Sequence, residues 1–315
     1  MLRYLYQSIC GVVRGAILLA AASTGVPAQT CTVSMPTIAF GNVDVLAGAA
    51  AYTTSPVSVS CSGGSSAGQR VCISIGAGSA SDATSRELTG PGSNTARYDI
   101  YANAAYTQLW GSWQTGYDVA GVQLDVPQNS SQSVTVYARF FGSQQTAAAG
   151  SYIATLTASP YIQYADKGAS SCPTGSNTAS TSVIATTTVV SNCNVSTTDI
   201  NFGSIGLLTG NTDASGSLTV QCNSTLPYAV SLSGGNAGAT DPTQRQMAGG
   251  TASIVYGLYS DSARSLPWGS TAGTNTVSAT GTGSSQILPV YGRIGPQTAP
   301  PPGNYSDTIV VTVNY

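Results

Sequence analysis

The sequence predicts an all-β protein that consists of two tandem antiparallel β-sandwiches. Only 7% of its 315 residues are charged, against about 25% in an average soluble domain. Exposed positions must therefore be filled mainly by Ser, Thr, Asn, Gln and Gly, which suit the faces of sheets better than long solvated helices. Apolar and polar residues alternate in several segments, and one series of landmarks occurs twice, which indicates strands in a duplicated domain.

The first 28 residues have the order of a secretory signal peptide. Arg3 and Arg14 provide a basic start, residues 16–22 (AILLAAA) form a short apolar core, and small residues lead to Ala28. A membrane anchor is the alternative, but the uninterrupted apolar run is much shorter than the roughly 20 residues that span a bilayer. We therefore predict that residues 1–28 are removed and that the chain is exported.

The cysteines predict three disulfides. Removal of the signal removes Cys10 and leaves six cysteines, an even number in an exported chain. Six cysteines allow fifteen pairings, and the repeated spacing of 30 and 29 positions selects one of them. The chain has no C-x-x-C motif and no histidine, so neither a metal site nor a cofactor is expected. The predicted pairs are Cys31–Cys61, Cys72–Cys172 and Cys193–Cys222.

A cysteine followed nine residues later by Phe-Gly opens both copies, at 31–41 and at 193–203. Further landmarks recur in the same order: Arg86 and Arg245, Tyr98 and Tyr256, Arg139 and Arg293, and Tyr152 and Tyr305. Residues that both copies share are expected to determine the fold rather than to bind a ligand. The aromatic members of this set, predicted as core or turn residues, are Phe40, Phe202, Tyr101, Tyr259, Trp110 and Trp268.

The segments between these landmarks have the pattern of strands. In 133–140 (SVTVYARF), apolar residues at every second position share one face, and 306–315 (SDTIVVTVNY) alternates in the same way. Turn-forming clusters such as 90–94 (GPGSN) and 233–238 (SGGNAG) separate such runs. No segment shows a convincing amphipathic helical pattern, so an all-β architecture is expected.

Taken together, these residues resemble the spore coat protein U domain, which is also the subunit fold of archaic, Csu-type chaperone–usher pili. The resemblance covers nearly the whole mature chain and is closer in the second copy, which ends with 303–315 (GNYSDTIVVTVNY), than in 150–164 (GSYIATLTASPYIQY). It implies immunoglobulin-like, pilin-type sandwiches, of which the C-terminal one lacks its last strand. It also implies that a periplasmic chaperone lends a strand, and that, at the usher, the N-terminal strand of the next pilus subunit replaces it. The residues expected at this acceptor edge are Ile309, Val311, Val313 and Tyr315.

Two segments suggest how the copies differ. The predicted mature chain starts at Gln29, and two residues before Cys31 cannot form a donor strand, so we expect a tip subunit. The segment 181–192 (TSVIATTTVVSN) is rich in β-branched residues, and we predict that 182–190 completes the first copy as its missing strand. An extended linker is the alternative. The predicted domains are 29–190, a receptor-binding domain, and 191–315, a pilin domain.

The first copy has apolar loop residues without counterparts in the second. Because binding residues are often found in loops, we predict that some of them project from the far end of the domain and contact a host or abiotic surface, either apolar or glycan. The alternative is that Trp113 and Tyr117 cover a locally larger core. The candidates are Leu46, Ala49, Ala50, Trp113, Tyr117, Val119, Val122, Ala147 and Ala148.

Composition argues against other classes of function. A net charge of −2 gives no electrostatic basis for binding nucleic acid. Without histidine there is no Ser-His-Asp or Cys-His arrangement, and the chain has a single glutamate, so an enzyme is not expected. The main hypothesis is a pilus tip adhesin that is exported through the periplasm to the cell surface and supports attachment and biofilm formation. The alternative is a secreted, spore-coat-like structural protein of a protective layer or matrix.

Overall fold

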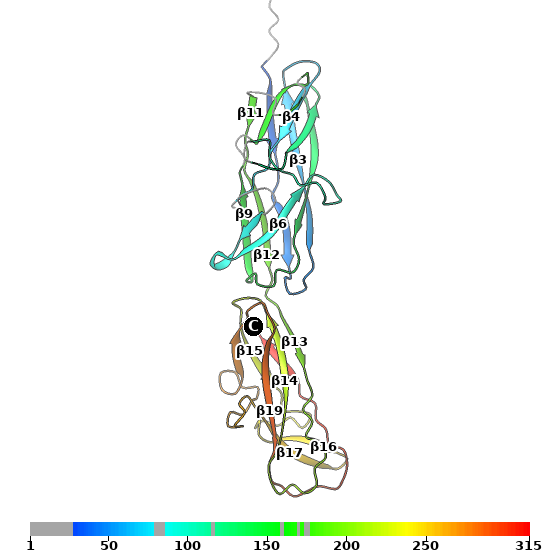
Figure 1. Ribbon diagram of the computed structural model, residues 1–315, viewed down its shortest axis with the longest axis vertical. Helices are drawn as coiled ribbons and strands as arrows, with labels where there is room; N and C mark the ends of the chain where they lie inside the picture. Colours follow the sequence, from blue (N-terminus) through cyan, green and yellow to red (C-terminus); the bar gives the residue numbers. More distant parts are fainter. Residues whose placement is uncertain (1–27, 79–85, 115–116, 158–160, 169–170, 173–176) are drawn as a thin grey trace, which may run out of the picture.

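The protein is described by a computed structural model that covers residues 28–78, 86–114, 117–157, 161–168, 171–172 and 177–315. Almost all regular structure in these residues is β-strand, so the predicted all-β class is confirmed. Figure 1 shows two β-sandwiches end to end along the longest axis: domain 1 (30–189) and domain 2 (193–314). The predicted signal peptide lies, except for Ala28, outside the described residues. Within the described residues, no helix is long and apolar enough to cross a membrane.

Domain 1 consists of a large and a small sheet that face each other. The large sheet has the order β1-β3-β8-β6-β5-β9-β12-β2, and the small sheet has the order β11-β10-β4-β7. A 3-10 helix, Pro91–Ser93, connects β5 and β6. The strands are β1 (Thr30–Ser34), β2 (Ile38–Val43), β3 (Ala51–Ser62), β4 (Gln69–Ile73), β5 (Glu87–Thr89), β6 (Thr95–Tyr101), β7 (Val122–Val126), β8 (Ser130–Phe140), β9 (Gly150–Leu156), β10 (Ile162–Asp166), β11 (Asn177–Ala179) and β12 (Val183–Val189).

Domain 2 repeats this plan with fewer strands. Its larger sheet has the order β13-β14-β19-β17-β16, and its smaller sheet has the order β18-β15-β20. In the described part of the chain, domain 2 has no strand that corresponds to β9, β12 or β2, which are neighbours in domain 1. The strands are β13 (Cys193–Thr197), β14 (Thr212–Cys222), β15 (Pro227–Leu232), β16 (Arg245–Gly249), β17 (Ala252–Tyr259), β18 (Val277–Thr280), β19 (Gln286–Ile294) and β20 (Val311–Asn314).

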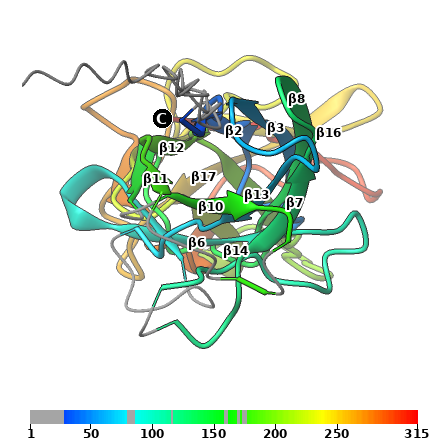
Figure 2. The same cartoon turned by 90° about the horizontal axis from the view of Figure 1, so that it is seen from above.

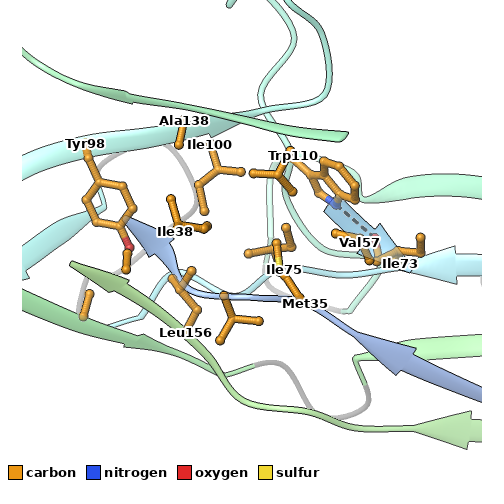
Figure 3. Packing of buried hydrophobic residues seen from close by; sticks show 14 of the residues in the cluster. Met35, Ile38, Val57, Ile73, Ile75, Tyr98, Ile100, Trp110, Ala138 and Leu156 are labelled. Atoms are coloured by element: carbon orange, nitrogen blue, oxygen red, sulfur yellow. Dashed lines mark hydrogen bonds between the residues drawn. The ribbon is translucent and has the colours of Figure 1, made fainter. Parts of the chain in front are cut away.

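The core of domain 1 lies between its sheets. Ile38, Ile100 and Ala138 of the large sheet and Ile73 of the small sheet are fully buried members of this core, and they are labelled in Figure 3. Trp110 is also fully buried and its Nε1 donates a hydrogen bond to the Ile73 carbonyl oxygen, 3.3 Å away. The equivalent Trp268 donates to the Val230 oxygen at 2.9 Å. The prediction that the shared tryptophans belong to the scaffold is therefore confirmed.

All three predicted disulfides are present. Cys31–Cys61 joins the paired strands β1 and β3, and Cys193–Cys222 joins β13 and β14 at the same position of domain 2. Cys72–Cys172 links β4 to the segment after β10 and closes a separation of 100 residues.

The two domains contact each other through a short polar junction. The Asn192 side-chain nitrogen donates to Asp44 Oδ2 of domain 1 at 2.7 Å, and the Asn192 backbone N–H donates to Asn223 Oδ1 of domain 2 at 2.6 Å. A parallel β-bridge between Ala148 and Ser224 lies beside them. These contacts join the end of domain 1 to the start of domain 2.

Candidate functional site

In domain 1 the sandwich is completed by β12, a strand from the segment that precedes domain 2. β12 pairs antiparallel with β9 and parallel with β2, and Figure 2 shows β12 beside β2 in the view along the long axis. Every second residue points into the core, where all four are at most 4% exposed: Val183, Ala185, Thr187 and Val189. The segment 181–192 is therefore a strand of the sheet and not an extended linker.

Domain 2 lacks a strand at the equivalent place. The counterparts of β2 and β9 are residues 200–205 and 303–309, and neither range forms a strand, apart from an isolated bridge between Ala248 and Ser306. A strand needs a neighbour to pair its backbone N–H and C=O groups. Without a central strand between them, the two flanking segments therefore remain irregular.

The gap is a groove with a volume of about 930 Å³ that opens on the core of domain 2. Five of its apolar lining residues are only partly buried, whereas their counterparts in domain 1 are 0–8% exposed. The core of domain 2 is thus uncovered along one side. The five partly buried groove residues are Ile200, Phe202, Met247, Ile254 and Ile309, and their counterparts in domain 1 are Ile38, Phe40, Leu88, Ala96 and Leu156.

The residues predicted at the acceptor edge divide between two places. Ile309 and Val311 line the groove. Val313 instead pairs with Val230 in the smaller sheet, on β20, and Tyr315 is 56% exposed beyond it. The opposite wall of the groove, 200–205, was missed by the sequence prediction. The repeated Phe-Gly motif lies in that wall and would have located it.

A polar pair lies at the base of the groove. The Tyr256 hydroxyl donates to Asp307 Oδ2 at 2.7 Å, and Asp307 Oδ1 accepts the backbone N–H of Asn236, also at 2.7 Å. Burial, together with this carboxylate, raises the pKa of Tyr256, so the phenol stays neutral and acts as a donor. In domain 1 the position of Asp307 is taken by Ala154, which is buried beneath β12. Asp307 is therefore a charged position of the groove that has no charged counterpart in the completed domain.

Three of the predicted receptor-binding residues are buried and face domain 2. Leu46 is 7% exposed, Ala147 is 2% exposed, and Ala148 is 1% exposed. The bridge from Ala148 to Ser224 places this loop at the junction. Ala49, which is exposed, and Ala50, which is half-buried, belong to the loop that carries Leu46. The prediction that these segments project from the far end of domain 1 is wrong, because strand order brings both loops to the end that carries domain 2.

The other four predicted residues lie along the side of domain 1. The Trp113 backbone N–H donates to Ser74 Oγ at 3.0 Å, and its Nε1 donates to the Val122 oxygen at 3.4 Å. The Tyr117 hydroxyl accepts the Ala77 N–H at 3.4 Å. Both rings, like Val119 and Val122, are half-buried, so they cover the local core and retain some exposed surface.

The far end of domain 1 is polar instead. Its loops follow β3 and β7 and precede β4, and they are joined by side-chain hydrogen bonds. The Gly63 N–H donates to Asn129 Oδ1 at 3.0 Å, the Ser65 N–H donates to Asp166 Oδ1 at 3.0 Å, and Gln128 Nε2 donates to the Gly64 oxygen at 2.7 Å. No group of three or more His, Cys, Asp or Glu side chains in the described ranges is placed to hold a metal ion.

A solved structure with a similar fold comes from a pilus system. A chain of the CsuC–CsuE chaperone–tip adhesion subunit pre-assembly complex, from archaic chaperone–usher Csu pili of Acinetobacter baumannii, matches with a TM-score of 0.52 and 17% identity. That match covers 91% of this chain and 100% of the other. The CupB6 tip adhesin of Pseudomonas aeruginosa matches with a TM-score of 0.41 and 12% identity, over 90% of this chain and 93% of the other.

Sequence comparisons identify the family. Protein U of Myxococcus xanthus is 31% identical over 106 residues, which is 32% of this chain. The match spans 59% of the length of that relative. The model of the Spore Coat Protein U domain matches twice, at residues 18–159 and 179–312, and so covers most of the sequence. The chain therefore belongs to the spore coat protein U domain family.

Proposed function

We propose that the chain is the tip adhesin subunit of a secreted chaperone–usher pilus. One observation carries this proposal: the place that β12 fills in domain 1 is an open groove in domain 2. A subunit with a completed domain at one end and an acceptor domain at the other suits the end of a fibre. The similar fold of the Csu chaperone–tip adhesion subunit complex supports the same role. In this role, domain 1 mediates surface attachment and biofilm formation.

The groove provides two driving forces for the insertion of a strand. Residues 200–205 and 303–309 offer backbone groups for pairing, as in β-strand addition. β12 is an internal template for the occupant: a seven-residue strand with four inward side chains. Burial of the two valines among them contributes about 3–6 kcal/mol before the cost of ordering the strand, at ~1.5–3 kcal/mol each. A periplasmic chaperone would supply this strand first, and at the usher the next subunit would supply it for the fibre.

The proposed role is adhesive and structural rather than enzymatic, and it implies passage through the periplasm to the cell surface. Domain 1 would contact a host or abiotic surface. Of the residues predicted for this contact, six have exposed surface and stay candidates: Ala49, Ala50, Trp113, Tyr117, Val119 and Val122.

The test is co-expression in a periplasm with and without a Csu-type chaperone from the same operon. We expect soluble protein only as a 1:1 complex. Ile309→Asp, which places a charge in the groove, should abolish the complex. Val310→Asp is the matched control, because Val310 is 61% exposed on the other face of the same segment.

A stable, protease-resistant monomer without chaperone would contradict the proposal. It would instead favour the spore-coat-like structural protein, for which domain 2 need not accept a strand.

A further inference from the structure

An aromatic surface lies on the outer face of the large sheet of domain 1. We define the aromatic–arginine surface as Tyr52, Tyr106, Tyr137, Arg139 and Phe141. Tyr52 and Arg139 are opposite each other on β3 and β8, and Tyr106 lies in the turn after β6. Tyr52 is 53% exposed, although it is a large aromatic residue. None of these residues takes part in the groove or in the junction.

Two of the rings lie near the Arg139 guanidinium group, and the others pack around Tyr106. The ring centre of Tyr106 is 4.8 Å from that of Tyr52 and 6.1 Å from that of Tyr137. The guanidinium carbon of Arg139 is 5.0 Å from the ring centre of Phe141 and 6.0 Å from that of Tyr52. Contacts of this kind orient a cation over aromatic faces. The surface therefore combines exposed apolar rings with a fixed positive charge.

Domain 2 has the same framework with different side chains. The turn after β17 has the same backbone conformation as the turn after β6, since Arg264 and its counterpart Tyr106 have φ values of 57° and 55°. In domain 2, Asp213 occupies the position of Tyr52. It accepts hydrogen bonds from Arg293 at 2.7 and 2.8 Å and lies 3.2 Å from Arg264. The counterpart of Arg139 is thus bound to a carboxylate.

In domain 1 that carboxylate is absent. Arg139 makes no ion pair within 4.0 Å in the described part of the chain, and its Nε is buried without a hydrogen-bond partner. Asp99 is opposite Arg139 on β6, but it is buried and lies 4.0 Å from the Arg86 guanidinium. The Tyr101 ring is buried, and its centre lies 5.5 Å from that of Tyr106. Relative to domain 2, the first copy has thus replaced the anion by an exposed aromatic ring.

We propose that the aromatic–arginine surface binds an acidic polysaccharide. The apolar face of a pyranose ring would stack on Tyr52 and Tyr106, and the carboxylate of the same sugar would pair with Arg139, as the carboxylate of Asp213 pairs with Arg293 in domain 2. Arginine suits this role because its planar donors match a carboxylate bidentately. The inference rests on the proposed function in taking domain 1 as the receptor-binding domain.

The experiment measures binding of the full mature chain, in complex with its chaperone, to immobilised oligogalacturonate. The fully methyl-esterified oligosaccharide is the ligand control, because it keeps the ring and loses the charge. We expect binding to the acid and at least tenfold weaker binding to the ester. Tyr52→Asp, which installs the arrangement of domain 2, should weaken binding by about tenfold or more, which corresponds to about 1.4 kcal/mol. Arg139→Gln should have a similar effect.

Arg293→Gln is the matched control, because it makes the same change at the equivalent position of domain 2 and should leave binding unchanged. Equal binding to acid and ester, or full binding by a folded Tyr52→Asp variant, would overturn the inference. Failure of the wild-type complex to bind the acid would also overturn it, while leaving the pilus subunit intact. If the chain is instead stable without chaperone, the pilus proposal fails, and the same binding is measured on the monomer.

Discussion

Arg86 and Arg245 are buried cations at equivalent positions of the two domains. Arg86 donates to the backbone oxygens of Gly76, Ile75 and Trp110 at 2.7–3.2 Å. Arg245 donates in the same way to the Trp268 oxygen at 2.8 Å. Burial lowers the pKa of Arg86, but several carbonyl oxygens compensate the charge. The arginine therefore satisfies carbonyl groups in the sandwich that would otherwise be unpaired, which explains why both copies have it.

Arg86→Met is expected to destabilise domain 1 by about 3–5 kcal/mol, because buried carbonyl oxygens lose their donors. The change in the free energy of unfolding is measured by urea unfolding, with hydrogen exchange of domain 1 amides as the readout. Arg97→Met is the control, since Arg97 is exposed, and its effect should stay within about 0.5 kcal/mol. Equal effects of the two variants would show that the carbonyl contacts contribute little.

Asp125 provides a pH-dependent contribution to domain 1. Its hydrogen bond to Arg70, at 3.1 Å, lowers the pKa of the Asp125 carboxyl, with a smaller contribution from Lys167. Because the pKa of Asp125 is lower in the folded state than in the unfolded state, the ionised carboxylate stabilises the fold above the unfolded-state pKa. This stabilisation is lost as the pH falls through the folded-state pKa. Because the Asp125 side chain is 33% exposed, the effect should be below about 1 kcal/mol. The Asp125→Asn variant should therefore be less stable than the wild type at pH 7 and equally stable at a pH below the folded-state pKa. Urea unfolding at the two pH values measures the difference in stability. A difference that persists at the lower pH would contradict this prediction.

At the scale of elements, the difference between the domains depends on β12. The alternation of 183–189 predicted a strand, and its apolar phase agrees with the buried positions. The pattern did not predict the strands with which β12 pairs, because β2 and β9 are far from it in the sequence. In the sheet, β2 and β9 flank β12 on its two edges. Pairing with both is what makes the large sheet of domain 1 complete.

Ala185→Asp should unfold domain 1, because a carboxylate would replace a methyl group that is 0% exposed. Ile184→Asp is the matched control, since the neighbouring side chain is 37% exposed on the opposite face. Limited proteolysis of the full chain, with or without chaperone, distinguishes the two. A protease-resistant domain 1 in the Ala185→Asp variant would mean that β12 is dispensable.

At the scale of the whole molecule, the junction joins the domains end to end. Asn192 connects Asp44 of domain 1 with Asn223 of domain 2. Because few residues lie between β12 and β13, the strand that completes domain 1 also positions domain 2. The two domains therefore lie end to end in an elongated body, as Figure 1 shows.

Replacing Asn192 and Asp44 together by alanine should loosen the junction without unfolding either domain. Small-angle X-ray scattering of the chaperone complex should show a shorter maximum dimension and a broader distribution of shapes. Asn194→Ala, at an exposed position of β13, should leave the scattering unchanged. Identical curves for all variants would place the rigidity elsewhere.

The sequence by itself determined the strand content, the duplication, the disulfide pairing and the position of β12. These features depend on local alternation and on the comparison of two copies, and both are visible along the chain. The duplication also contained part of the signal for the aromatic–arginine surface, since Tyr106 and Phe141 replace Arg264 and Gly295. That Tyr52 takes the place of Asp213 follows only from the strand register.

Only the tertiary structure decided which of these residues meet. Sheet order brings Tyr52 and Arg139 together across 87 positions (139 − 52). Sheet order also places the loops with Leu46 and Ala148 at the end of domain 1 that faces domain 2. It places residues 200–205 and 303–309 on opposite walls of the groove. The physical reason is that strand pairing is non-local: alternation specifies which side chains are buried, but the neighbours of each strand depend on the packing of the whole domain.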